Sequence, residues 1–177
     1  MVMKALSSVL CPQTSSVFVW TARGCTQTII LEAAMLSYMQ QHRQTAPWAS
    51  EAGGQLFGLI DDNAIRVIRA TGPYVSDERS RYHYRSNSAS AQCAIEAQAQ
   101  AGLLYLGEWH SHAEDHPNES DLDKDAMSRL MANSKLNCNA LLLLIVGRIS
   151  GPEGLAIISV APDKVRRWYL SMSNPMM

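Results

Sequence analysis

The sequence has little net charge and few charged residues of either sign. Its 15 Lys and Arg residues stand against 16 Asp and Glu residues, which leaves a net charge of −1, and charged residues make up 18% of the chain. A protein that binds nucleic acid by neutralising phosphates needs a basic excess, so we expect no nucleic-acid partner. Intrinsic disorder is also disfavoured, because 47% hydrophobic residues in 177 are enough to build one core.

Paired cysteines and long apolar runs are absent as well. The four cysteines stand at positions 11, 25, 93 and 138, and none forms a C-x-x-C pair. This argues against a disulfide framework or a thiolate zinc site and fits a reducing cytoplasm. We expect Cys93 and Cys138 to be small buried residues. No apolar stretch reaches membrane-spanning length, so no membrane partner is expected.

Predicted strands alternate with predicted helices along most of the chain. The strands are expected at 17–21, 51–60, 64–69, 103–109, 140–146, 155–160 and 165–170, with a long loop over 72–87 that runs into a short strand. The helices are expected at 26–43, 88–100 and 120–134. This order predicts a mixed α/β sheet with helices packed on it. We expect one domain over 17–170, a loose leader at 1–16 and a tail at 171–177.

The most informative stretch lies between the strand expected at 103–109 and the helix expected at 120–134. His110 and His112 are two residues apart, which places both imidazoles on one side of an extended segment. Asp123 follows after ten intervening residues, one turn into the helix that Ser120 opens as its N-cap. Two imidazoles and one carboxylate, with a fourth position left for water, form the ligand set of catalytic zinc. The sequence therefore predicts one Zn²⁺ held by His110, His112 and Asp123.

Hydrolysis at such a zinc ion also needs a general base, and Glu51 is the candidate. It stands just ahead of a strand that contains Gly53, Gly54 and Gly58. Glycine within a strand marks a bulge or the close approach of another backbone or ligand. We expect these glycines to let the strand pack close beside the metal, although a solvated Glu51 and simple bulges are the alternatives.

Taken together, these motifs resemble the JAMM (MPN-plus, or JAB-domain) metalloproteases. The family pattern is a distant glutamate, then H-x-H, ten residues and an aspartate, with a serine three residues before that aspartate. Glu51, His110, His112, Ser120 and Asp123 fill every position. The resemblance covers about residues 17–170. It implies a single-domain α/β fold of the cytidine-deaminase-like type, in which helices flank a mixed, largely antiparallel sheet.

The resemblance also implies a role for each residue. His110, His112 and Asp123 would hold the zinc, Glu51 would move a proton from the attacking water to the leaving amine, and Ser120 would donate a hydrogen bond to the oxyanion. One position departs from the family pattern. Proline usually follows the second histidine, but here that position is Ala113, so the loop after His112 is expected to have its own shape.

Among these proteases, the chain is most similar to the small bacterial deconjugating peptidases of anti-phage CBASS operons. The E-x-G-G-x-L-F-G strand and the 72–87 stretch carry this likeness. It implies a bacterial, cytoplasmic isopeptidase that cleaves after the C-terminal tail of a ubiquitin-like or otherwise conjugated protein. The expected partners are a cGAS-like nucleotidyltransferase and the E1–E2 enzyme that conjugates it. Added-strand recognition beside the 72–87 loop would suit such a tail.

Other functions and other roles for nearby residues stay open. Processing of a sulfur-carrier or ubiquitin-like precursor uses the same atoms, and a non-catalytic scaffold is the alternative from another class. A zinc deaminase is disfavoured because it requires H-x-E and P-C-x-x-C. We expect His116 to be an exposed loop residue, Trp109 to be core, and Glu108 to have no catalytic role. An acidic rim of Glu114, Asp115, Glu119 and Asp121 is either solvated or attracts a basic substrate segment.

Overall fold

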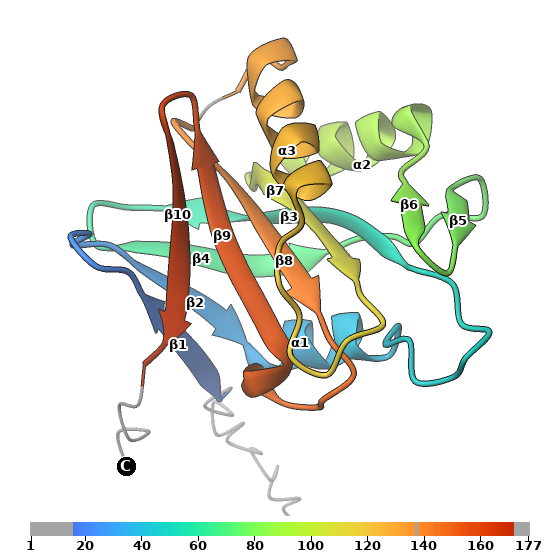
Figure 1. Cartoon of the computed structure of the whole chain (residues 1–177). Coiled ribbons are helices and arrows are strands. Elements are labelled where there is room, and N and C mark those ends of the chain that lie inside the picture. Colours follow the sequence, from blue (N-terminus) through green and yellow to red (C-terminus); the bar gives the residue numbers. More distant parts are fainter. Residues whose placement is uncertain (1–15, 137, 172–177) are drawn as a thin grey trace, which may run out of the picture.

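The computed structural model describes residues 16–136 and 138–171. Eight strands form one closed barrel in the order β1-β10-β9-β8-β7-β3-β4-β2, and a separate hairpin forms a second, two-stranded sheet (Figure 1). The barrel strands are β1 (Val17–Thr21), β2 (Thr28–Glu32), β3 (Gly53–Ile60), β4 (Ala64–Ala70), β7 (Leu104–Ser111), β8 (Leu141–Val146), β9 (Leu155–Ala161) and β10 (Lys164–Leu170). The hairpin consists of β5 (Glu78–Ser80) and β6 (His83–Arg85). The helices are α1 (Ala33–Gln40), α2 (Ser88–Gln100) and α3 (Asp121–Asn133), with a 3₁₀ turn at Pro152–Gly154.

The α/β class and the mixed, largely antiparallel pairing agree with expectation. Strand pairs β2–β4 and β7–β8 are parallel, and the other pairs are antiparallel. The sheet differs from the expected sheet with flanking helices in that it closes on itself, which leaves the barrel without a free edge. The expected leader and tail lie almost wholly outside the described residues.

The helix expected at 26–43 was wrong over its first half. Residues Thr28–Glu32 form β2, and the helix begins only at Ala33. The β-branched run Thr28-Ile29-Ile30 favours a strand, and β2 completes the barrel by pairing with β1 on one side and β4 on the other. The remaining apolar positions, Met35, Leu36 and Met39, still face the core from α1.

Two apolar clusters account for the hydrophobic pattern. The larger fills the barrel and includes Trp20, Leu56, Trp109 and Leu144, together with the buried face of α1. The smaller lies between α3 and the outer face of β8 and β9, and Met127 is its contact from α3. Alternate β8 residues belong to different clusters, which explains why β8 reads as an unbroken apolar run.

The fold also tests the expectations for the 72–87 loop and for Cys93 and Cys138. The 72–87 loop contains two short strands instead of one. Cys93 is exposed on α2, which corrects the expectation that it is buried, whereas Cys138 is partly buried against the smaller cluster. Among the described residues, no helix is both long and apolar enough to cross a membrane.

Candidate metal centre and active site

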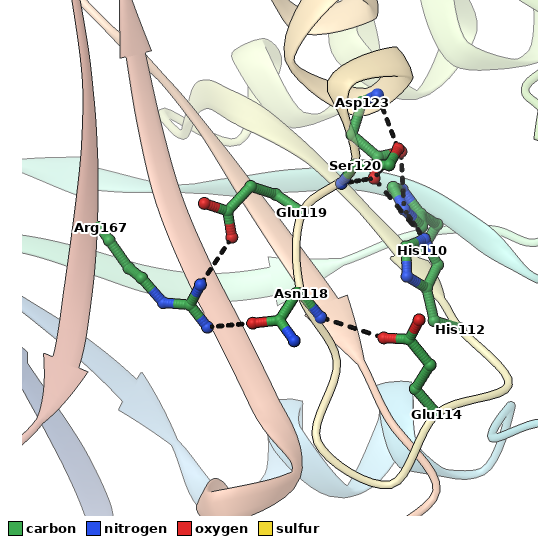
Figure 2. A network of polar contacts seen from close by, with 8 residues as sticks. All are labelled: His110, His112, Glu114, Asn118, Glu119, Ser120, Asp123 and Arg167. Atoms are coloured by element: carbon green, nitrogen blue, oxygen red, sulfur yellow. Dashed lines mark hydrogen bonds and ion pairs between the residues drawn. The ribbon is translucent and has the colours of Figure 1, made fainter.

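Two histidines at the end of β7 and an aspartate at the start of α3 converge on one point (Figure 2). The Nε2 atoms of His110 and His112 are 2.9 Å apart. Asp123 places Oδ1 3.3 Å from Nε2 of His110 and Oδ2 3.7 Å from Nε2 of His112. One ligand atom from each residue lies within 4.8 Å of the others. The structure thus brings together the three residues that the sequence predicted as metal ligands.

The local sequence explains this convergence. His110 and His112 alternate along an extended strand with Ser111, whose side chain is fully buried on the opposite face. At the start of α3, Ser120 is the N-cap, as predicted. Its Oγ accepts a hydrogen bond from the backbone N–H of Asp123, and Asp123 in return accepts one from the backbone N–H of Ser120. This reciprocal capping box fixes the direction of the Asp123 carboxylate.

The protonation states of the cluster suit a divalent cation. Burial alone would raise the pKa of Asp123, but hydrogen bonding and charge from His110, together with hydrogen bonds from Ser120, hold that pKa well below its usual range. Burial, and then the charge of His110, lower the pKa of His112. A carboxylate and a neutral imidazole are the forms that bind metal.

The donor atoms of the cluster lie near the spacing that a zinc site requires. Ligand atoms about 2.0–2.1 Å from a tetrahedral ion lie about 3.3–3.4 Å from each other. The two Nε2 atoms, 2.9 Å apart, and Oδ1 of Asp123, 3.3 Å from Nε2 of His110, lie near that value, whereas the 3.7 Å contact with His112 is made by the other carboxylate oxygen, Oδ2. The donor set is therefore compatible with zinc and leaves a fourth corner for water or substrate.

Glu51 is brought to the histidines by the residue that follows it. Ser111 N–H donates to the carbonyl of Ala52 (2.8 Å), and Ala52 N–H donates to Oγ of Ser111 (3.0 Å). Gly53 is the register partner of His110 in the β3–β7 pair. Because Ala52 and Ser111 point into the core, Glu51 lies on the same face as the two imidazoles.

The environment of Glu51 suits proton transfer. Its side chain is nearly buried, with 9% exposed. Burial raises the pKa of Glu51 to about 7; the charge of His110 opposes this shift, and the charge of Asp123 reinforces it. Arg79 Nε donates to the main-chain carbonyl of Glu51 (2.5 Å), and Glu51 N–H donates to Ser80, so the 72–87 hairpin holds this residue in place. A carboxylate with a pKa near 7 is balanced between accepting and releasing a proton at neutral pH.

The loop between the ligands is tied down by the protein's own cations. Arg167 of β10 donates to Glu119 and to Asn118, both at 2.9 Å, and Glu114 accepts from the backbone of Asn118 (Figure 2). Ion pairs Arg148–Asp115 and Lys124–Asp121 engage two more acidic groups. Three of the four residues of the expected acidic rim are therefore paired internally, which weakens the idea that the rim attracts a basic substrate segment. His116 is exposed, as expected.

The β3 glycines permit close approach, although of protein backbone and not of the metal centre itself. A Cβ on Gly54 would lie 1.8 Å from the carbonyl oxygen of Thr71, and one on Gly53 would lie 2.4 Å from that of Trp109. Side chains at these positions would force the neighbouring segments away from β3. The glycines thus act on the site indirectly, because they set the spacing between Glu51's strand and the histidine strand.

A groove of about 1110 Å³ leads to the metal cluster. It is lined by residues of β7, α2 and α3 and by Tyr84, Arg85 and Ser86 in and after β6, and the lining includes His110 and Asp123. The apolar lining includes Ile95, Leu104, Met127 and Leu130. An extended peptide segment could lie in such a groove with one bond at the cluster.

Sequence reasoning missed several residues that build the site. Ser111, the variable position of H-x-H, joins the histidine strand to Glu51, and the strand alternation that buries it was the available signal. Arg167 lies far away in the sequence, and nothing in its surroundings indicated contact with the ligand loop. Gln55 is fully buried and bonded to Ser86, Tyr74 and Glu108, so it connects β3 to the hairpin segment.

Comparison with known proteins places these observations in a family. The family model of prokaryotic homologs of the JAB domain matches residues 32–171. A CD-NTase/cGAS isopeptidase from Pseudomonas aeruginosa is 32% identical over 73% of this chain and 83% of its own length. One of the same name from Vibrio cholerae is 33% identical over 64% of this chain and 70% of its own length.

A solved structure agrees with the fold. Protein DSY2949 from Desulfitobacterium hafniense superposes with a TM-score of 0.55 at 26% identity, covering 77% of this chain and 87% of that one. The span that the family model matches, residues 32–171, contains both histidines, Ser120, Asp123 and Glu51. The chain therefore belongs to the prokaryotic JAB-domain family.

Proposed function

We propose that this chain is a zinc-dependent isopeptidase that cleaves the amide bond after the C-terminal tail of a ubiquitin-like or otherwise conjugated protein. The observation that carries the proposal is the joint placement of His110, His112 and Asp123 within 4.8 Å with the nearly buried Glu51 on the same face. A ligand set with one open corner and an adjacent base of raised pKa is the arrangement that metal-assisted hydrolysis requires.

The relatives indicate the substrate. Two curated relatives at about a third identity are named CD-NTase/cGAS isopeptidases. We infer that this chain releases a cGAS-like nucleotidyltransferase from its conjugates and so reverses an E1–E2 reaction in bacterial anti-phage defence. The leaving group would then be the ε-amine of a target lysine.

Each residue has a distinct task in this mechanism. When bound, zinc supplies a Lewis acid that polarises the scissile carbonyl and acidifies water. Glu51 takes the proton of the attacking water and delivers it to the leaving amine, a transfer that its pKa of about 7 favours. His110, His112 and Asp123 would hold the cation.

Ser120 is proposed to stabilise the oxyanion. In this structure its hydroxyl donates to Oδ2 of Asp123 (2.7 Å). Because a hydroxyl carries one hydrogen, Ser120 can donate to substrate only when Asp123 is satisfied by another partner. A cation bound to Asp123 is such a partner, so metal binding and release of the Ser120 hydroxyl are coupled in this proposal.

The tail is proposed to enter along the groove beside β6. Strand β6 pairs with β5 on one side, and its residues Tyr84 and Arg85 line the groove. An extended tail can add to a strand edge through main-chain hydrogen bonds, with side chains reading the walls.

The test combines metal analysis with hydrolysis of a conjugate. The purified wild-type chain should contain about one zinc ion per molecule and should cleave a nucleotidyltransferase–lysine isopeptide conjugate. Glu51→Gln should keep the zinc and lose cleavage, whereas His112→Ala should lose both. Full cleavage by Glu51→Gln, or by protein stripped with chelator, would contradict the proposal. A parallel assay with a sulfur-carrier precursor shows whether the chain prefers that alternative substrate to the conjugate.

A further inference from the structure

A carboxylate lies in the groove close to the metal cluster and has no part in the mechanism above. Glu108 is two residues before His110 and lines the groove with it. The register of β3 and β7 shifts between Leu56 and Phe57, and Gly107 has a φ of 141°. This bulge places Tyr105 and Glu108, three residues apart, on one face of the strand. Glu108 therefore points to the groove, while Leu106 and Trp109 point to the core.

Glu108 is only partly exposed and has few hydrogen-bond donors for a carboxylate. In the described part of the chain it accepts a short bond from the Tyr105 hydroxyl (2.7 Å) and two long ones from the Gln55 amide (3.4 and 3.5 Å). A carboxylate has room for about four hydrogen bonds. Oε2 is left with only the long bond from Gln55.

The groove does not supply the missing partner from its own cations. Arg85, Arg129 and Lys135 line it, yet the ion pairs found among the described residues join none of them to Glu108. The charges that act on Glu108 are those of His110, which favours the carboxylate, and of Asp77, which opposes it. A partly dehydrated carboxylate beside apolar walls is compensated best by a cation that also donates a hydrogen bond.

We propose that Glu108 is a specificity-determining residue that binds a lysine or arginine side chain of the substrate tail, within one or two residues of the scissile bond. Two residues of strand separate it from His110, a distance of roughly 7 Å, which is the span of about two residues of an extended peptide. The inference rests on the proposed peptidase function and specifies which tails the groove selects. A tail with an acidic residue at this position is rejected, because two carboxylates would face each other.

The test measures binding without hydrolysis. In a Glu51→Gln background, zinc-loaded protein is titrated with short fluorescent peptides joined through a C-terminal glycine to the ε-amine of lysine. The peptides carry arginine, norleucine or glutamate in turn at each position near the scissile bond, and affinity is read by fluorescence anisotropy. At one position, arginine should bind about tenfold more tightly than norleucine, the value of a charge-assisted hydrogen bond.

Glu108→Gln should reduce this preference to about twofold or less. Glu96→Gln, which makes the same charge change on the exposed surface of α2, should leave the preference unchanged. Tyr105→Phe removes the internal donor and keeps the carboxylate, so the arginine peptide should bind at least as tightly as before. Equal binding of arginine and norleucine peptides, an undiminished preference in Glu108→Gln, or no binding of any peptide would overturn the proposal.

Binding and cleavage fail separately in this design. If wild-type protein cleaves none of the peptides but the arginine preference depends on Glu108, the peptidase function fails and the groove specificity stands. If wild-type protein cleaves the peptides but the arginine preference does not depend on Glu108, the peptidase function stands and the groove specificity fails. Melting temperature and zinc content, measured for every variant, show that Glu108→Gln retains the fold and the metal site.

Discussion

The hydroxyl of Ser111 accepts a hydrogen bond from the backbone N–H of Ala52 at 3.0 Å, and this bond joins the two halves of the site. Ser111 stands between the two histidines, and Ala52 follows Glu51. Both residues are fully buried, so water does not replace the bond if it is lost. The serine in H-S-H is therefore a structural link between the metal-binding strand and the general base.

Ser111→Ala should lower both stability and activity. The substitution leaves the buried N–H of Ala52 without a partner, which costs about 1–3 kcal/mol of unfolding free energy. Glu51 should lose its fixed position, so kcat should fall while zinc affinity is retained. Urea denaturation, hydrolysis and zinc titration measure the three effects. Ser150→Ala, in an exposed loop, is the matched control. A stable, fully active Ser111→Ala variant would remove the proposed link.

The sequence predicts the local parts of this site better than the long-range ones. H-x-H and S-x-x-D have fixed spacing, so strand alternation and helix capping place His110, His112, Ser120 and Asp123 directly. Barrel closure was not predictable in this way, because it depends on β2, whose residues also satisfy a helical pattern. Here the tertiary pairing of Thr28–Glu32 with β1 and β4 decided against helix.

The bulge in β7 shows a second limit. Strict alternation places Tyr105 and Glu108 on opposite faces, but the register shift and the positive φ of Gly107 bring them together. One inserted residue changes the face of every side chain on one side of it. A glycine in a strand signals that a bulge can occur but does not fix its position, so the groove face of β7 had to be observed.

Glu51→Gln should make the metal-free protein relatively more stable as the pH rises. Burial raises the pKa of Glu51 from 4.5 to about 7, so the folded chain holds this proton more tightly than the unfolded chain does. Below pH 4.5 Glu51 is protonated in both states, so it does not destabilise the folded wild type. As the pH rises from there to about 7, the wild type loses unfolding free energy. Glutamine does not ionise and avoids this loss, which is worth up to about 3 kcal/mol.

Thermal unfolding in chelator across this pH range measures the effect. The melting temperature of Glu51→Gln minus that of the wild type should increase from pH 4.5 to pH 8. Glu96→Gln, on the exposed surface of α2, serves as the control and should show no such trend. A constant difference for Glu51→Gln would show that Glu51 is not appreciably desolvated in solution.

Ser120→Ala separates the capping role of Ser120 from its proposed role in the reaction. Loss of the cap should cost about 1 kcal/mol of unfolding free energy. Loss of the oxyanion donor should slow turnover by about 100-fold with zinc retained. Asn87→Ala is the matched control, because the Asn87 side chain caps α2 by accepting from Ser90 N–H and has no proposed role in the reaction. It should lose similar stability and keep nearly full turnover. Equal turnover in the two variants would leave Ser120 with capping alone.

Arg167→Ala should weaken zinc binding from a distance. Arg167 bonds Glu119 and Asn118, just before the Ser120 cap, and the pair with Glu119 is partly buried (Figure 2). Without the Arg167 side chain, the loop before Asp123 is more flexible, so cation binding costs more conformational entropy. Groups that orient metal ligands typically contribute 10- to 100-fold in affinity, and Arg167 acts one step further away, so a loss of about tenfold is expected.

Competition with a fluorescent zinc chelator measures this loss of zinc affinity, and the exposed Arg23→Ala is the control. Because the ligands themselves are untouched, saturating zinc should restore most of the activity; activity that stays low in saturating zinc would mean that Arg167 acts on the reaction and not on the position of the loop.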